Sequence, residues 1–427
     1  MTKIKSISII VFSLLSMSSV FAQLDFSLEV RPRSEYRHGF KALANEGQEA
    51  AFFIDQRTRF NTMFTEDAID LKISLQDVRV WGNQPQLVIG DGNLTSVHEA
   101  WAKVKFDSKL AIKVGRQEIA YDDERIFGAV GWAQQARSHD AALLMYQDSS
   151  FKAHLGLAFN QNSAGLISTL YTINNYKAMQ YLWLHKDWNR ANLSLLFLNN
   201  GRQVIDGQGN AAGTNFSQTV GGKFDVKGSK IGLNSAFYYQ MGRQANLQST
   251  EISAYYANLD MIFFLSKGHK ITFGGEILSG NNQTTGDQER NEAFSPFYGT
   301  NHKFNGLMDY FYVGNHANSV GLHDYYVKWA MKKKKFNTGV HVHLFNSDGT
   351  VNDASGKSLS AHLGTEVDIV FGFPVTKNVK VSGGYSQMFS TNSLVALRST
   401  GSLDATSNWF WTMITINPSF KVSKIGY

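Results

Sequence analysis

Residues 24–37 read LDFSLEVRPRSEYR, and apolar and polar side chains alternate along them. Leu24, Phe26, Leu28 and Val30 share one face, whereas charged residues occupy most of the other. A period of two with one apolar face is typical of a β-strand that is buried on one side only. This stretch of 14 residues is long for a strand of a soluble sheet, but it suits a tilted strand in a membrane wall.

The same alternation recurs along the chain, for example over residues 52–64, 151–160 and 362–371. Short polar turns lie near residues 66–68, 107–109, 148–150, 188–189, 227–229, 266–268, 332–335 and 374–376. Longer polar stretches lie near residues 39–50, 82–95, 121–137, 161–176, 200–214, 242–250, 281–320, 347–360 and 390–406. Short and long connections alternate, as periplasmic turns and extracellular loops do in bacterial barrels. Nine long and eight short connections predict about 18 strands, with both ends of the chain in the periplasm.

These strands are expected to close into a ring. An open sheet in lipid would leave unpaired N–H and C=O groups along its edges, each costing several kcal/mol. No Pro- or Ser-rich linker divides the chain, so we expect a single all-β domain over residues 23–427: one antiparallel transmembrane barrel. Residues 304–314 are assigned to the longest loop, folded inward. Pro418 predicts a bulge or a restart in the last strand.

The N-terminus has the pattern of a secretory signal peptide, which we predict over residues 1–22. Lys3 and Lys5 precede an apolar core, and Val20-Phe21-Ala22 forms a small-residue cleavage site. There is no cysteine, so neither a disulfide framework nor a lipoprotein anchor is available. The predicted location is the outer membrane of a Gram-negative cell, in contact with its lipid.

Arginine is concentrated early: nine of the 14 lie between Arg31 and Arg137. Strand alternation points many of these side chains into the lumen. A bulge near Gln76 would also turn Arg79 inward, and a change of alternation at Gly115 would do the same for Arg116. Arg125 and Arg137 fall in the following loop, which could fold into the pore. The predicted pore-lining, anion-binding set is Arg31, Arg33, Arg57, Arg59, Arg79, Arg116, Arg125 and Arg137.

A line of guanidinium groups would offer an anionic solute successive weak sites, because the planar fork matches a carboxylate. The alternative is that each arginine braces the wall. Acidic residues are interspersed among the arginines, and charged groups in a barrel seldom stay unpaired. They are Glu29, Glu35, Asp55, Asp77, Glu99 and Glu118.

Other residue patterns carry less chemistry. His341 and His343 share an inward face at a spacing that two metal ligands could use, but no acidic partner is identifiable from sequence. Aromatic pairs such as Tyr181 with Trp183 suit an interfacial girdle or ordinary cross-strand packing, and so does Trp409 with Trp411. We expect no cofactor, no metal, no enzymatic activity and no nucleic-acid partner.

Several motifs resemble those of the alginate export family of outer-membrane barrels. The central ones are GRQE at 115–118, YDDERIFG at 121–128, Trp132 and ARSHD at 136–140. Supporting pieces are RPRSEYR at 31–37, DQRTRF at 55–60, DVRVWG at 77–82, GGEILSGN at 274–281 and FYGTNHKFNGLMDYF at 297–311.

The resemblance implies a passive, arginine-rich channel for the anionic polysaccharide alginate. An export channel could also have periplasmic partner proteins, on which the sequence is silent. Asp122, Asp123 and Glu124 lie inside the central motif, so the path is not uniformly basic. A general or substrate-specific porin that takes up small anions would have the same fold. A barrel enzyme or a surface adhesin is a third class.

Overall fold

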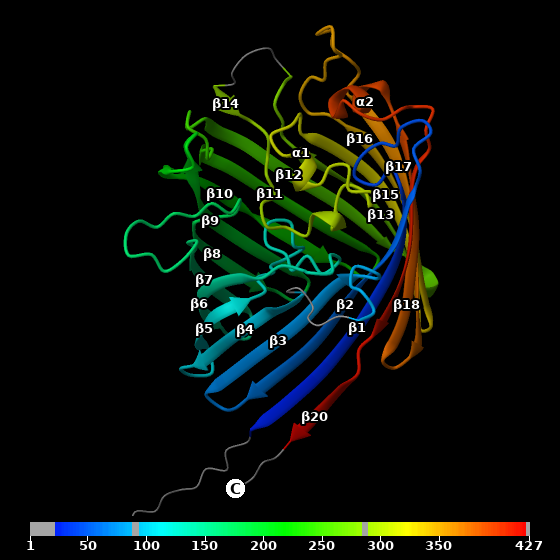
Figure 1. Ribbon diagram of the computed structural model, residues 1–427. Coiled ribbons are helices and arrows are strands. Elements are labelled where there is room, and N and C mark those ends of the chain that lie inside the picture. The colour runs from blue at the N-terminus through cyan, green and yellow to red at the C-terminus, as the bar shows by residue number, and fades with distance from the viewer. Residues whose placement is uncertain (1–21, 88–93, 284–288, 424–427) are drawn as a thin grey trace, which may run out of the picture.

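The computed structural model describes residues 22–87, 94–283 and 289–423, which form one closed antiparallel barrel (Figure 1). Strand β1 (Gln23–His38) pairs with β2 (Ala51–Thr65) on one side. On its other side it pairs with β19 (Ser407–Ile416) and β20 (Ser419–Ser423), which closes the ring. The predicted signal peptide lies outside the described residues, apart from Ala22.

The other strands follow their neighbours in chain order. They are β3 (Ile69–Val80), β4 (Thr95–Lys105), β5 (Leu110–Gln117), β6 (His139–Gln147), β7 (Phe151–Phe159), β8 (Ala178–Asp187), β9 (Ala191–Ile205), β10 (Ala211–Lys227), β11 (Ile231–Arg243), β12 (Glu251–Phe264), β13 (His269–Leu278), β14 (Arg290–Asn291), β15 (Leu322–Lys333), β16 (Phe336–Asn346), β17 (His362–Thr376) and β18 (Val379–Ser390). The helical segments are short: η1 (Ser266–Gly268), η2 (Asn301–Lys303), α1 (Val313–His316) and α2 (Asn392–Arg398). Within the described ranges, no helix is long and apolar enough to cross a bilayer.

The described residues contain eighteen wall strands, which confirms the predicted fold. Of the twenty labelled strands, β14 lies in a loop, where it pairs in parallel with β12. Strands β19 and β20 are two halves of one wall strand that restarts after Pro418, as the proline predicted. The Pro418 carbonyl still accepts a hydrogen bond from Leu28 N at 3.0 Å, so the break does not open the wall.

Long connections gather at one rim and short turns at the other, where β1 begins and β20 ends (Figure 1). One predicted boundary was wrong. The loop expected over residues 200–214 spans only residues 206–210. Residues 200–205 belong to β9 and residues 211–214 to β10, and the two strands pair here, with Arg202 opposite Asn215 and Gln203 opposite Thr214. Their polar side chains had indicated a loop.

The two faces of the wall differ as the alternation predicts. Outward side chains are large and apolar, and about half of the surface of Ile73, Leu157 and Phe237 is exposed. Such a belt suits contact with lipid. The predicted aromatic girdle was wrong at both pairs named above: Tyr181, Trp183, Trp409 and Trp411 are all buried on the inward face.

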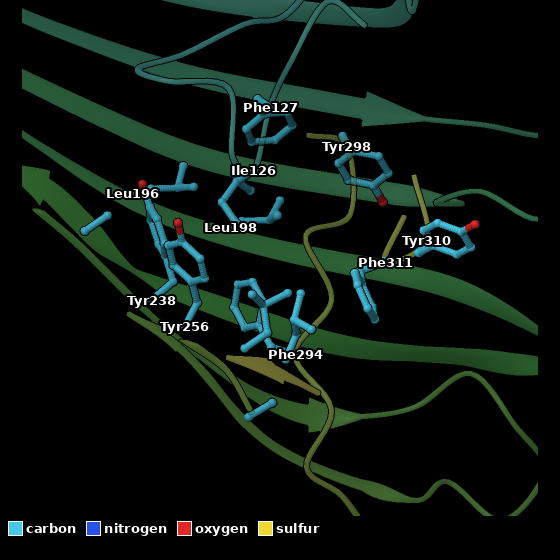
Figure 2. Packing of buried hydrophobic residues seen from close by; sticks show 14 of the residues in the cluster. Ile126, Phe127, Leu196, Leu198, Tyr238, Tyr256, Phe294, Tyr298, Tyr310 and Phe311 are labelled. Atoms are coloured by element: carbon cyan, nitrogen blue, oxygen red, sulfur yellow. The ribbon is translucent and has the colours of Figure 1, made fainter. Parts of the chain in front are cut away.

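Two connections fold into the barrel. We call residues 118–138, between β5 and β6, the inner loop, and residues 279–321, between β13 and β15, the long loop. They meet in a parallel bridge between Phe127 and Tyr298, where Gly128 N donates to the Tyr298 carbonyl at 2.8 Å. Figure 2 shows Phe127 and Tyr298 side by side, within a cluster that also takes in wall residues such as Leu198 and Tyr256. Residues 304–314 belong to this inward-folded segment, as predicted.

Candidate functional site

Four inward arginines from β1 and β2 face the inner loop, and we call Arg31, Arg33, Arg57 and Arg59 the arginine ladder. Arg31 Nη1 donates to the Gly131 carbonyl at 2.8 Å, and Arg31 Nη2 donates to Gln134 Oε1 at 2.8 Å. Arg31 has no carboxylate within 4 Å among the described residues. Its charge is therefore held by loop carbonyls and an amide.

Arg33 joins the wall to the loop by a different set of contacts. Its guanidinium pairs with Glu35 and Asp55, both at 2.8 Å, and its Nη1 donates to the Trp132 carbonyl at 2.7 Å. The Trp132 ring in turn stacks on His302 of the long loop, with ring centroids 4.5 Å apart. Arg33 thus supports both inward-folded segments through one tryptophan.

The other two members of the ladder are only partly paired with acids. Arg57 binds Glu29 at 2.6 Å and donates to the Gln134 carbonyl at 3.3 Å. Arg59 donates to Gln76 Oε1 at 2.9 Å and lies 3.8 Å from Glu118, at the first position of the inner loop. Three of the four arginines therefore brace the wall through carboxylates, whereas Arg31 has no carboxylate partner among the described residues.

The structure places two predicted lining residues on the outer face, as corrections. The register between β2 and β3 is unbroken from Asp70 to Val80, so Arg79 shares the face of Leu71 and Leu75. The bulge that was expected near Gln76 lies on the next strand, where His98 of β4 is the extra residue. The predicted slip therefore does not reach Arg79.

Arg116 also stays outward, because Gly115 adopts φ +118° without shifting the register between β5 and β6. Arg116 pairs with Asp140 at 3.0 Å at the rim of the long connections, where both side chains are well exposed. The expected cost of a lipid-facing charge is avoided there by exposure and pairing. Glu118, which follows the last residue of β5, does lie inward, 3.8 Å from Arg59.

Arg125 and Arg137 lie in the inner loop and contact the long loop or the far wall. Arg125 is fully buried, with Nη2 3.2 Å from Glu276 of β13 and 3.2 Å from Asn305 Oδ1. Burial is the largest effect and disfavours its charge, but Glu276, Tyr256, Asp123 and Asp324 together outweigh burial and raise the Arg125 pKa. Arg137 donates to the Gly299 carbonyl at 3.2 Å, and burial lowers its pKa. Both arginines hold the two loops in place.

The wall from β13 to β17 is acidic, a feature that sequence reasoning missed; β17 is separated from β1 of the ladder only by β18 and β19. Four inward carboxylates, each at most 2% exposed, come from three strands: Glu276 on β13, Asp324 on β15, and Glu366 and Asp368 on β17. Asn305 of the long loop donates to Glu276 at 2.7 Å, and Met308 N donates to Glu366 at 2.8 Å. Glu366 and Asp368, two residues apart on one strand, indicated an acidic inward face. Nothing in the sequence showed that Glu276 of another strand lies near them.

A cavity of about 580 Å³ opens at the foot of the ladder, on the inner side of β1 to β4. Its lining includes Arg59, Lys72, Trp101 and Glu118. The ammonium group of Lys113 lies 4.2 Å from the Trp101 ring and has no carboxylate within 4 Å among the described residues. The size is in the range of small-molecule sites, and the lining combines the Trp101 ring with three cations and three carboxylates: Arg59, Lys72, Lys421, Asp25, Glu99 and Glu118.

The closed barrel with a charged lumen defines an integral outer-membrane channel, and comparison with known proteins agrees. The family model described as Alginate export matches residues 22–402, so the chain belongs to the alginate export family. A comparison with curated protein sequences found no match. The family and the fold are those of channels rather than of enzymes.

Similar solved structures share the fold at low sequence identity. OccAB4 of Acinetobacter baumannii is 12% identical with a TM-score of 0.62, covering 94% of this chain and 99% of its own. OccK9 (OpdG) of Pseudomonas aeruginosa is 11% identical with a TM-score of 0.62, covering 93% and 98%. OpdK of the same organism, solved with vanillate, is 11% identical with a TM-score of 0.57, covering 93% and 99%.

Proposed function

We propose that this channel passes anionic solutes, with an anionic polysaccharide of the polyuronate type as the first candidate. The observation that carries the proposal is the cavity at the foot of the arginine ladder. Arg59 and Lys113 both face this region. Among the described residues, Arg59 has one ion pair, a long one of 3.8 Å with Glu118, and Lys113 has none. Their charge is therefore available to a carboxylate, and Trp101 adds a surface for a sugar ring.

The experiment is planar-bilayer conductance of the refolded protein, with the reversal potential measured under a salt gradient before and after adding oligouronate. Anion selectivity and block by oligouronate are expected, and both should weaken in Arg59→Gln and Lys113→Gln. Arg243→Gln is the matched control, because among the described residues the Arg243 side chain makes its one hydrogen bond to the nearby Ser249 carbonyl at the rim, away from the ladder. A neutral oligosaccharide should not block. A large conductance that is weakly selective and indifferent to the uronate would refute the proposal.

A second candidate is the uptake of small anions, and the inward-folded loops favour it. The inner loop and residues 294–311 of the long loop occupy the lumen, which suits a small solute better than a polymer chain. The OpdK structure was solved with vanillate, which is a small carboxylate. Liposome swelling in small carboxylates of increasing size separates the two functions: a sharp size limit supports uptake, whereas oligouronate passage supports export.

Export of a polymer would also require periplasmic partner proteins. Lys103 and Lys105 at the end of β4 and Lys109 of the following turn line a recess near the short-turn rim, together with Asp107 and Asp148. This basic surface would suit an acidic partner or the approach of the polymer itself. Charge reversal of Lys109, which lies in the turn, should then lower oligouronate block without changing the conductance in salt alone.

A further inference from the structure

We propose that the inner wall of β16 and β17 binds one divalent transition-metal ion, such as Zn²⁺, through His341, His343 and Asp368. One ring nitrogen of each histidine and one oxygen of Asp368 lie within 4.8 Å of one another. His341 and Asp368 are direct cross-strand partners, and His343 is two residues further along the same strand. Two imidazoles and a carboxylate are a common ligand set for zinc and iron.

The tautomer of His343 is already set for metal binding. Its Nδ1 lies 2.9 Å from both carboxylate oxygens of Asp324, so this nitrogen carries the proton and donates it. Nε2 is left as the acceptor, and it lies 4.0 Å from Asp368 Oδ2. A carboxylate behind a ligating histidine is the usual arrangement that fixes the ring and raises its basicity. Asp324 is thus a positioning residue.

Asp368 presents an oxygen with no protein partner. Its Oδ1 accepts a hydrogen bond from Ser386, whereas the buried Oδ2 has no hydrogen-bond partner among the described residues. Asp368 is fully buried and His343 is 2% exposed. An unsatisfied buried carboxylate oxygen is costly, and a bound cation would remove that cost.

The charge of the surrounding wall also favours a cation. Glu276, Asp324, Glu366 and Asp368 are nearly inaccessible to solvent, and among the described residues Arg125 is the only arginine or lysine that forms an ion pair with them. Lys328 faces His341 across β15 and β16, but its ammonium group lies over the Tyr326 ring at 3.9 Å. A divalent ion would offset two of the excess negative charges.

Metal binding requires only a small closure. Ligand atoms about 2.1 Å from a tetrahedral zinc ion lie roughly 3.4 Å apart. The gap of 4.0 Å between His343 Nε2 and Asp368 Oδ2 could close by side-chain rotation. The ion would tie β16 to β17, and Asp324 would link it to β15. The fourth position would remain open toward the lumen, where His341 is the least buried ligand.

The test is titration of the tag-free, detergent-refolded barrel with Zn²⁺ against a chromophoric chelator. We expect one zinc ion per barrel, with affinity reduced at least tenfold in His341→Asn and in Asp368→Asn, and about 10- to 100-fold in Asp324→Asn. His185→Asn is the control, because His185 is an inward histidine that pairs with Asp187 elsewhere in the wall. Substituting Co²⁺ should give visible absorption in the wild type that is lost in His341→Asn.

Folding of each variant is checked by the gel mobility of the unheated barrel. His341 is only partly buried, so His341→Asn is expected to fold even if Asp368→Asn does not. Zinc binding that is absent from the wild type, or equal in wild type and His341→Asn, would overturn the proposal. The outcome is independent of which solute the channel carries.

Discussion

The guanidinium carbon of Arg33 lies 4.2 Å from the centroid of the Trp132 ring, and the same guanidinium donates to the Trp132 carbonyl at 2.7 Å. One side chain of β1 therefore holds both the ring and the backbone of the inner loop. Cation–π contacts of this kind contribute about 1 kcal/mol or more where water is excluded. The arginine ladder thus determines where the inner loop sits and also contributes positive charge to the lumen.

Loss of Arg31 should loosen the inner loop. In Arg31→Gln the loop carbonyls of Gly131 and Trp132 lose a charged donor, at a cost of about 2 kcal/mol. We expect a larger and noisier single-channel conductance and a lower thermal midpoint. Bilayer recordings and thermal unfolding in detergent measure these effects, with Arg243→Gln as the control. An unchanged conductance would show that the loop does not limit the pore.

The junction of the two loops depends on Gly299. A Cβ at this position would lie 2.2 Å from the Arg125 carbonyl oxygen, so Gly299→Ala must push the loops apart. Overpacking of this kind costs typically 1–3 kcal/mol. We expect faster proteolysis of the inner loop and a raised conductance. Gly314→Ala is the matched control in the same loop, because its Cβ would meet only ordinary contacts at 3.5 Å.

The buried pair of Arg125 and Glu276 should show strong coupling in a double-mutant cycle. Arg125→Gln leaves Glu276 charged and buried, which costs about 3–5 kcal/mol, whereas Arg125→Gln with Glu276→Gln should recover part of that loss. Chemical unfolding of the refolded barrel measures all four corners of the cycle. Additive losses would mean that the two charges do not depend on each other.

His316 should make the barrel sensitive to acid. Burial, followed by the charge of Arg398, lowers the His316 pKa from 6.5 to about 3. The unfolded chain therefore takes up a proton below pH 6.5 that the folded chain does not, so stability falls as the pH drops from 6.5 toward 3. The loss would be about 2 kcal/mol at pH 5.

Thermal midpoints between pH 7 and pH 4 test this prediction. His316→Gln should flatten the decline, and His185→Asn, which replaces a histidine of β8 away from α1 and α2, is the control. A decline of equal slope in wild type and His316→Gln would assign the acid sensitivity to other groups. The affected region would be the contact of α1 with α2, where Arg398 Nη2 lies 3.3 Å from His316 Nδ1.

The strand count, the closed barrel and the inward face of the arginine ladder could be predicted, because each depends on alternation within one strand. The faces of Arg79 and Arg116 could not. A bulge shifts one strand relative to its partner, and a single strand does not reveal which of the two carries the extra residue: here it is His98. Likewise, Gly115 tolerates a positive φ without turning the next side chain.

The hydrogen-bond partners of the site's arginines also could not be predicted from the sequence pattern. Arg31 and Gln134 are 103 residues apart in the chain, and Arg125 and Asn305 are 180 apart. Neither contact follows from periodicity, because loops have no repeating face. The acidic wall is a further example, since Glu276 and Glu366 come from different strands and each accepts a hydrogen bond from the long loop.

The bond between β1 and the inner loop constrains the order of assembly. The first wall strand must hold a segment more than 90 residues further along the chain and also pair with β19, the strand that completes the ring. Once that ring has closed, a loop carrying Trp132 can reach its place only through the open mouth. Contacts so distant in sequence form slowly, since their closure entropy is paid first. Docking of the interior is therefore expected to be the last and slowest step of folding, and newly closed barrels should pass briefly through a wide-open, leaky stage.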